Sequence, residues 1–71
     1  MDGDGRRIEV IGGSGVYLLV LKGSGDVVGS FYSEGDGWWR GRTPGGEVRR
    51  LWVEPDAEEP WREVGERMLR P

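Results

Sequence analysis

Cysteine and histidine are both absent from this chain of 71 residues. Without cysteine the chain forms neither a disulfide nor a thiolate nucleophile, and without both residue types it lacks the usual ligands of structural zinc. The absence of histidine also removes the commonest general acid–base catalyst near neutral pH. We therefore expect no catalytic residue, no metal and no cofactor, and we expect a protein that is not an enzyme.

Asparagine and glutamine are also missing, and the one lysine, Lys22, stands against nine arginines. This scarcity of residues with A/T-rich codons is typical of a GC-rich genome, so we expect a bacterial or phage source. The first residues are acidic rather than basic, and the longest apolar run, residues 16–21, is far shorter than a membrane span. A cytoplasmic protein with no membrane partner is the expectation that follows.

The small size of the chain limits how it can be stabilised. A domain of this length buries only about 60% of the surface that its unfolded chain exposes. Small domains without disulfides or metals depend on dense packing or on oligomerisation. Four tryptophans are the bulkiest side chains available for packing, and a homodimer remains an alternative. We expect one small domain at residues 6–71, after a disordered N-terminus at residues 1–5.

Short alternating segments separated by glycine-containing turns predict an antiparallel sheet. Apolar and charged residues alternate over residues 6–11, and residues 16–21 and 27–33 are rich in strand-forming apolar side chains. A last hairpin runs through residues 38–53. We therefore predict an α+β fold, in which a three- to four-stranded β-meander spans about residues 7–53 and one C-terminal helix packs on it.

The C-terminal segment predicts this helix at about residues 57–70. Asp56 followed by Glu59 matches a capping box, although Pro60 is equally suited to the first helical position. Four apolar residues have the spacing of one helical face, and we expect them to pack on the sheet: Trp61, Val64, Met68 and Leu69.

Residues 38–53 carry the most informative pattern in the chain. Side chains on a strand alternate between the two faces of a sheet, so we expect Leu51 and Val53 to face the core together with Trp39. The opposite face then collects two tryptophans and three arginines, residue types that dominate binding hot spots. We call this set the Arg/Trp face; it consists of Trp38, Arg40, Arg42, Arg50 and Trp52.

Charge is distributed unevenly along the chain, whose net charge is −3. Residues 38–53 contain four arginines and one glutamate, a net charge of +3, and the segments on both sides of them are acidic. Such an asymmetry orients a charged partner even when the overall charge has the opposite sign. The alternative interpretation is a solvated strand face whose arginines pair with neighbouring acidic residues.

Part of this region resembles the central stretch of SH3 domains. The match covers about residues 25–48. It rests on the Gly-Asp-Val-Val turn at residues 25–28 and on the Gly-Trp-Trp-Arg-Gly segment at residues 37–41, which a glycine-containing turn and a second strand follow. The resemblance implies an SH3-like fold in which Trp38 contacts a proline-rich ligand and Asp36 contributes acidic specificity.

The layout of a small sheet followed by a helix also resembles the arm-type DNA-binding domains of tyrosine recombinases, which lay a sheet face in the major groove. This resemblance implies contacts from arginine side chains to phosphates or guanine edges. The arginines concerned are Arg40, Arg42, Arg49 and Arg50.

Three functions follow as alternatives. The leading one is a small non-enzymatic protein-interaction module that binds a protein partner through the Arg/Trp face, with Asp36 and Arg49 as additional contact residues. The second is a nucleic-acid-binding accessory protein that uses the same face. The third is a self-associating small structural protein that pairs through an exposed strand edge. The acidic balance of the chain and its lack of asparagine and glutamine, the usual adenine readers, count against the second.

Overall fold

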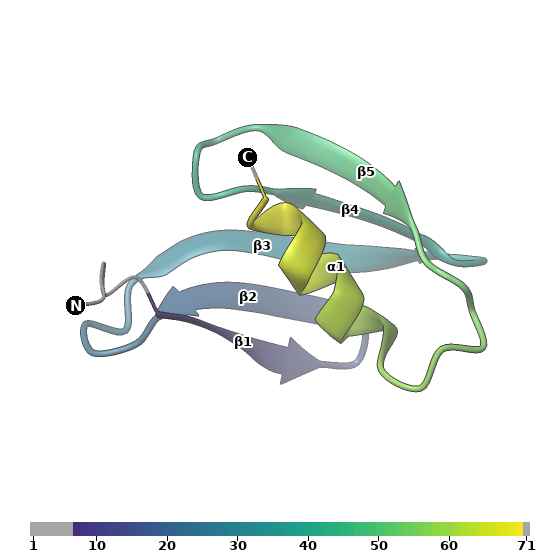
Figure 1. The fold of residues 1–71 in the computed structure, drawn as a ribbon, viewed down its shortest axis with the longest axis horizontal. Helices are drawn as coiled ribbons and strands as arrows, with labels where there is room; N and C mark the ends of the chain where they lie inside the picture. The colour runs from purple at the N-terminus through teal and green to yellow at the C-terminus, as the bar shows by residue number, and fades with distance from the viewer. Residues whose placement is uncertain (1–6, 71) are drawn as a thin grey trace.

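A computed structural model of the protein describes residues 7–70, so the disorder expected for residues 1–5 lies outside the described residues. The elements are β1 at Ile8–Gly13, β2 at Val16–Leu21, β3 at Val27–Gly35, β4 at Trp38–Arg42, β5 at Val48–Trp52 and α1 at Pro60–Met68. All five strands join in one antiparallel sheet in chain order. The helix lies across one face of this sheet, and within residues 7–70 nothing covers the other face (Figure 1).

The α+β class and the C-terminal helix are confirmed, but the sheet has five strands rather than three to four. Residues 8–11, within the segment that the sequence offers as a strand, pair with β2, and β1 extends beyond them through Gly12 and Gly13. A two-residue turn connects the two strands, with φ of 58° at Ser14 and 84° at Gly15. Two consecutive positive φ values suit the twist of a tight hairpin, so this glycine-rich segment continues the sheet rather than ending it.

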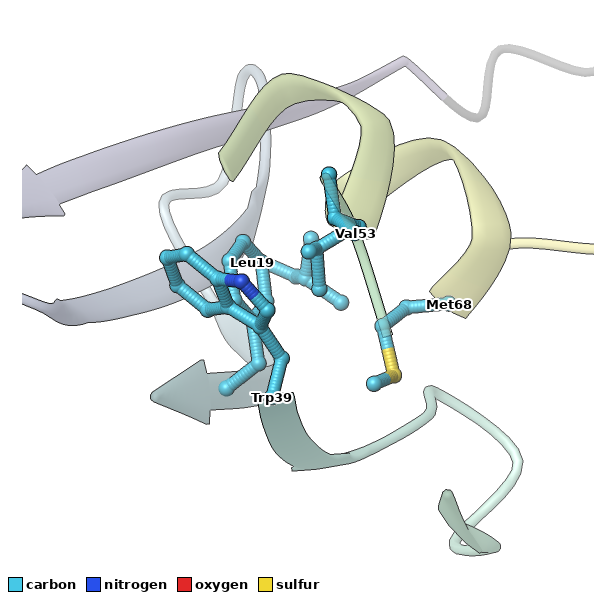
Figure 2. Packing of buried hydrophobic residues seen from close by; sticks show 6 residues of the cluster. Leu19, Trp39, Val53 and Met68 are labelled. Atoms are coloured by element: carbon cyan, nitrogen blue, oxygen red, sulfur yellow. The ribbon is translucent and has the colours of Figure 1, made fainter. Parts of the chain in front are cut away.

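The hydrophobic core lies between α1 and the sheet, and Figure 2 shows side chains from strands and helix meeting there. The aromatic ring of Tyr17 stacks at 5.3 Å from that of Phe31 and at 5.7 Å from that of Trp61. The expectation that Trp39 and Trp61 pack in the core is thereby confirmed. The buried cluster consists of Leu19, Phe31, Trp39, Val53, Val64 and Met68, with Trp61 packed against it.

The helix begins at Pro60 rather than at about residue 57 and ends at Met68 rather than at 70. Glu59 is the residue before the first helical turn, but the structure gives no side-chain hydrogen bond that caps this end. The predicted capping box is therefore wrong, and the alternative with proline in the first turn is confirmed. Within residues 7–70 the structure contains no helix that is long and apolar enough to cross a bilayer.

A helix of nine residues is marginal in isolation, so α1 depends on its contacts with the sheet. Val64 and Met68 are fully buried, whereas Leu69, at the end of the predicted apolar stripe, is 39% exposed. Gly65 lets the helix backbone approach β1, because a Cβ atom at this position would lie 2.9 Å from Cγ2 of Val10. The second half of the helix therefore packs closely on the sheet, in addition to Trp61 in the first turn.

A β-bulge interrupts the register between β3 and β4 next to their turn. Ser33 pairs with Trp39 but Gly35 pairs with Trp38, so Glu34 is the extra residue. Bulges increase the local twist and re-aim side chains. This one keeps Glu34 within the sheet, beside the uncovered face.

Candidate functional site

The uncovered face of the sheet carries all five residues of the Arg/Trp face. On β4 the side chain of Trp39 is buried toward the helix, and the residues on either side of it are exposed. The same alternation continues along β5. The register places Trp38 opposite Trp52 and Arg40 opposite Arg50. The alternation predicted from the sequence is therefore present, and it gathers these side chains on one water-facing side.

Two tryptophans form a cross-strand pair at one end of this face. Trp38 is 36% exposed and Trp52 is 43% exposed. The indole Nε1 of Trp52 donates a hydrogen bond to the carbonyl oxygen of Asp36 at 3.1 Å, which holds this ring in place. Tyr32 on β3, opposite Arg40, is 43% exposed and adds a third aromatic ring to the same face. Aromatic rings that keep an apolar surface in water while a polar atom is hydrogen-bonded are suited to contact with a partner.

Arg40 and Arg50 lie directly opposite each other on the adjacent strands β4 and β5. Like charges in this position destabilise a sheet. Glu34 relieves this repulsion. Its Oε2 accepts a hydrogen bond from Nε of Arg40 at 2.9 Å, and its Oε1 accepts one from Nε of Arg50 at 2.8 Å. Cζ of Arg50 also lies 4.1 Å from the ring centroid of Trp38, within the range of a cation–π interaction. Both guanidinium groups are therefore held in defined positions.

The neutralisation of these arginines is partial, because one carboxylate serves two guanidinium groups. Arg42 forms no ion pair with any residue between 7 and 70; its Nη1 donates a hydrogen bond to the carbonyl oxygen of Gly46 at 3.1 Å. The alternative interpretation, in which the arginines of the face pair with neighbouring acidic residues, thus holds for Arg40 and Arg50 but not for Arg42. The Arg/Trp face keeps an excess of positive charge.

The carboxyl group of Glu34 gives this arrangement a dependence on pH. The hydrogen bond from Arg50 is the main cause that holds the pKa of Glu34 below its ordinary value, and the hydrogen bond from Arg40 acts in the same direction. Glu34 in turn raises the pKa of Arg40 through their hydrogen bond. The pKa of Glu34 is lower in the folded protein than in the unfolded chain. The stabilising contribution of Glu34 is therefore complete above its pKa in the unfolded chain, and it is lost as the pH falls through its pKa in the folded protein.

We therefore expect the free-energy difference between the wild type and Glu34→Gln to shrink as the pH falls from neutral to acidic values. Urea unfolding of both proteins over a pH series measures this difference, and a carboxyl NMR titration gives the midpoint of Glu34 directly. A difference that stays constant with pH, or a midpoint at or above the ordinary glutamate value, contradicts the expectation.

A shallow hollow of about 210 Å³ lies on the same face. It is on the far side of Arg40 from the tryptophan pair, where Tyr32 faces Arg40 and Ser30 faces Arg42 across β3 and β4. Its lining combines donor groups with a small apolar contribution from Val48. The residues that line it are Ser30, Tyr32, Arg40, Gly41, Arg42 and Val48.

The two additional residues predicted for the site are placed differently. Arg49 points to the helix side of the sheet, where its Nη1 donates a hydrogen bond to the carbonyl oxygen of Arg67 at 2.7 Å and its Nη2 pairs with Glu47 at 3.1 Å. Arg67 in turn donates from Nη1 to the carbonyl oxygen of Trp52 at 3.2 Å. Arg49 therefore ties the helix end to β5 and does not join the Arg/Trp face. Asp36 adjoins that face through its backbone carbonyl.

The sequence interpretation missed three residues of this surface: Tyr32, Glu34 and Val48. Tyr32 and Val48 fall on the correct face by alternation alone, but the cross-strand register that brings them beside Arg40 and Arg42 depends on how the strands pair. Glu34 also falls on this face by alternation from Tyr32, but its position between Arg40 and Arg50 depends on how β3 pairs with β4 at the bulge between Ser33 and Gly35.

Comparisons of the chain with models of protein families, with curated proteins and with solved structures found no match.

Proposed function

We propose that this protein is a small non-enzymatic interaction module that binds a protein partner through the Arg/Trp face. One observation carries the proposal: the face that the helix leaves uncovered holds two exposed tryptophans and three arginines, and each arginine is hydrogen-bonded to Glu34 or to the carbonyl oxygen of Gly46. Trp38 and Arg50 stack on each other, and the ring of Trp52 is tied to the backbone of Asp36. Side chains ordered before binding lose less conformational entropy when a partner docks.

The net charge of the chain and the contacts of its arginines favour a protein partner over a nucleic acid. The chain has a net charge of −3, and phosphate contacts dominate the affinity of most nucleic-acid-binding proteins. Of the four arginines that the recombinase resemblance implies as contacts, Arg49 is directed to the helix side, and Arg40 and Arg50 share Glu34. These contacts leave Arg42 as the arginine of the face without a carboxylate partner among residues 7–70.

A display selection tests the proposal. Random short peptides would be selected on the wild-type protein and counter-selected on a Trp38→Ala/Trp52→Ala double variant, with proline-rich peptides included because of the SH3 resemblance. We expect a pool of peptides that bind the wild type and lose binding to the double variant. Peptides that bind both proteins equally would place the interaction elsewhere and reject the Arg/Trp face.

Two further measurements test the alternative functions, nucleic-acid binding and self-association. A titration with duplex DNA distinguishes the nucleic-acid alternative, because binding through phosphates weakens steeply between about 50 and 200 mM salt. Sedimentation equilibrium over a concentration series distinguishes self-association. Salt-sensitive DNA binding that is lost in Arg42→Gln, or a dimer in place of peptide binding, would contradict the proposed function.

A further inference from the structure

The hollow on the uncovered face is lined by hydrogen-bond donors. The hydroxyl groups of Ser30 and Tyr32 are able to donate, and each guanidinium group carries five N–H donors. Among the described residues, Arg40 uses its Nε on Glu34 and Arg42 uses one Nη1 hydrogen bond on Gly46. Both arginines therefore keep most of their donors for a ligand. None of the six lining residues is acidic.

Such a lining suits an anionic oxygen ligand, because charge-assisted hydrogen bonds from arginine to carboxylate are among the strongest that proteins form. Glu34 provides a precedent within the molecule, since its carboxylate is held between Arg40 and Arg50 at 2.9 and 2.8 Å. The hollow lies on the other side of Arg40, where Arg42 takes the place of Arg50. A second carboxylate would meet donors of the same kind there.

We propose that this hollow binds a carboxylate side chain, aspartate or glutamate, of an extended partner segment whose apolar residue contacts Trp38 and Trp52. The inference rests on the proposed function and names the chemistry of its partner. A carboxylate is favoured over a nucleic-acid phosphate because the chain as a whole is acidic and because Tyr32 and Val48 add apolar surface to the hollow.

The geometry of β4 sets the spacing of the partner residues. Alternate residues on one side of a strand are about 6.6 Å apart, so Trp38 and Arg42 lie about 13 Å apart along the strand. A segment that runs along β4 in an extended conformation therefore has its carboxylate two to four residues from the apolar residue. This spacing defines the probe.

The probe is an acetylated and amidated peptide in which a leucine is followed by glutamates at the next two alternate positions, with serine between them. A matched peptide has glutamine in place of both glutamates. Binding is followed by the amide resonances of residues 30, 41 and 42 and by the dissociation constant. We expect the glutamate peptide to bind about tenfold more tightly than the glutamine peptide.

Two variants identify the residue responsible. Arg42→Gln is expected to remove the preference for glutamate. Arg62→Gln is the matched control, since Arg62 is an exposed arginine of α1 that pairs with Glu59 at 2.9 Å, and it should keep the full tenfold preference. The amide spectrum of each variant shows whether it has folded.

The other outcomes overturn the inference. If the wild type binds both peptides equally and Trp38→Ala weakens both, the carboxylate site is wrong while the proposed function stands. A preference that survives in Arg42→Gln rejects the hollow as its source. Shifts of the same residues with inorganic phosphate at equal concentration indicate a general anion site, and the absence of shifts with either peptide rejects binding at this hollow.

Discussion

Phe31→Ala is expected to lower the free energy of unfolding by about 3–5 kcal/mol, the usual cost of removing a buried phenylalanine from a core. Phe31 is 1% exposed and is one of the largest fully buried side chains. Its ring stacks on Tyr17 and meets Trp39 edge-on at 5.8 Å. A domain of this size has a total stability of about 4–10 kcal/mol, so the variant should be largely unfolded or melt at least about 12 °C lower.

Tyr32→Ala is the matched control, because Tyr32 is the next residue along β3 and points to the uncovered face. It is 43% exposed, and its loss should cost about 1 kcal/mol or less. Urea unfolding followed by tryptophan fluorescence measures both variants. Equal destabilisation by the two substitutions would show that the assignment of the two faces of β3 is incorrect.

The second large effect concerns binding. Trp38→Ala is expected to weaken the binding of peptides selected on the wild type by about ten- to a hundredfold, because truncated tryptophans at the centre of an interface commonly cost about 2 kcal/mol or more. The substitution also removes the ring on which Arg50 stacks. Trp52→Ala should weaken binding in the same direction, since its ring forms the other half of the pair.

Leu69→Ala serves as the control for these binding measurements. Leu69 is an exposed apolar residue, 39% accessible, but it follows the helix on the opposite side of the sheet. Its substitution should leave the dissociation constant unchanged. Isothermal titration calorimetry on all three variants, with unfolding curves for each, separates a loss of binding from a loss of fold. An equal loss in Leu69→Ala and Trp38→Ala would argue against a localised interaction face.

The composition of both faces of the last hairpin could be predicted because it depends only on alternation along the strand. Trp39 and Trp38 are neighbours in sequence, and the pleat alone sends one to the core and the other to water. The apolar spacing of Val64 and Met68 likewise indicated which side of the helix would be buried. Local periodicity was sufficient in both cases.

Features that depend on strand pairing or on distant contacts could not be predicted in this way. Gly12 and Gly13 have low strand propensity, yet they complete β1 because the tight turn after them aligns the two strands. Alternation places Arg49 on the same side of β5 as Leu51, but its hydrogen bond to the carbonyl oxygen of Arg67 depends on the position of the helix end, 18 residues further along the chain. The bulge that sets Glu34 between two arginines is likewise a property of the paired strands.

The order of the elements also has a consequence for synthesis of the protein. Each strand lies beside the strand that precedes it in the chain, so the sheet can assemble by closing short loops, at little entropic cost, as it emerges from the ribosome. The helix that covers Leu19, Phe31 and Trp39 is made after all five strands. A nascent sheet without residues 60–68 exposes the apolar face that the helix covers in the folded protein, and exposed apolar surface of this kind promotes aggregation and chaperone binding.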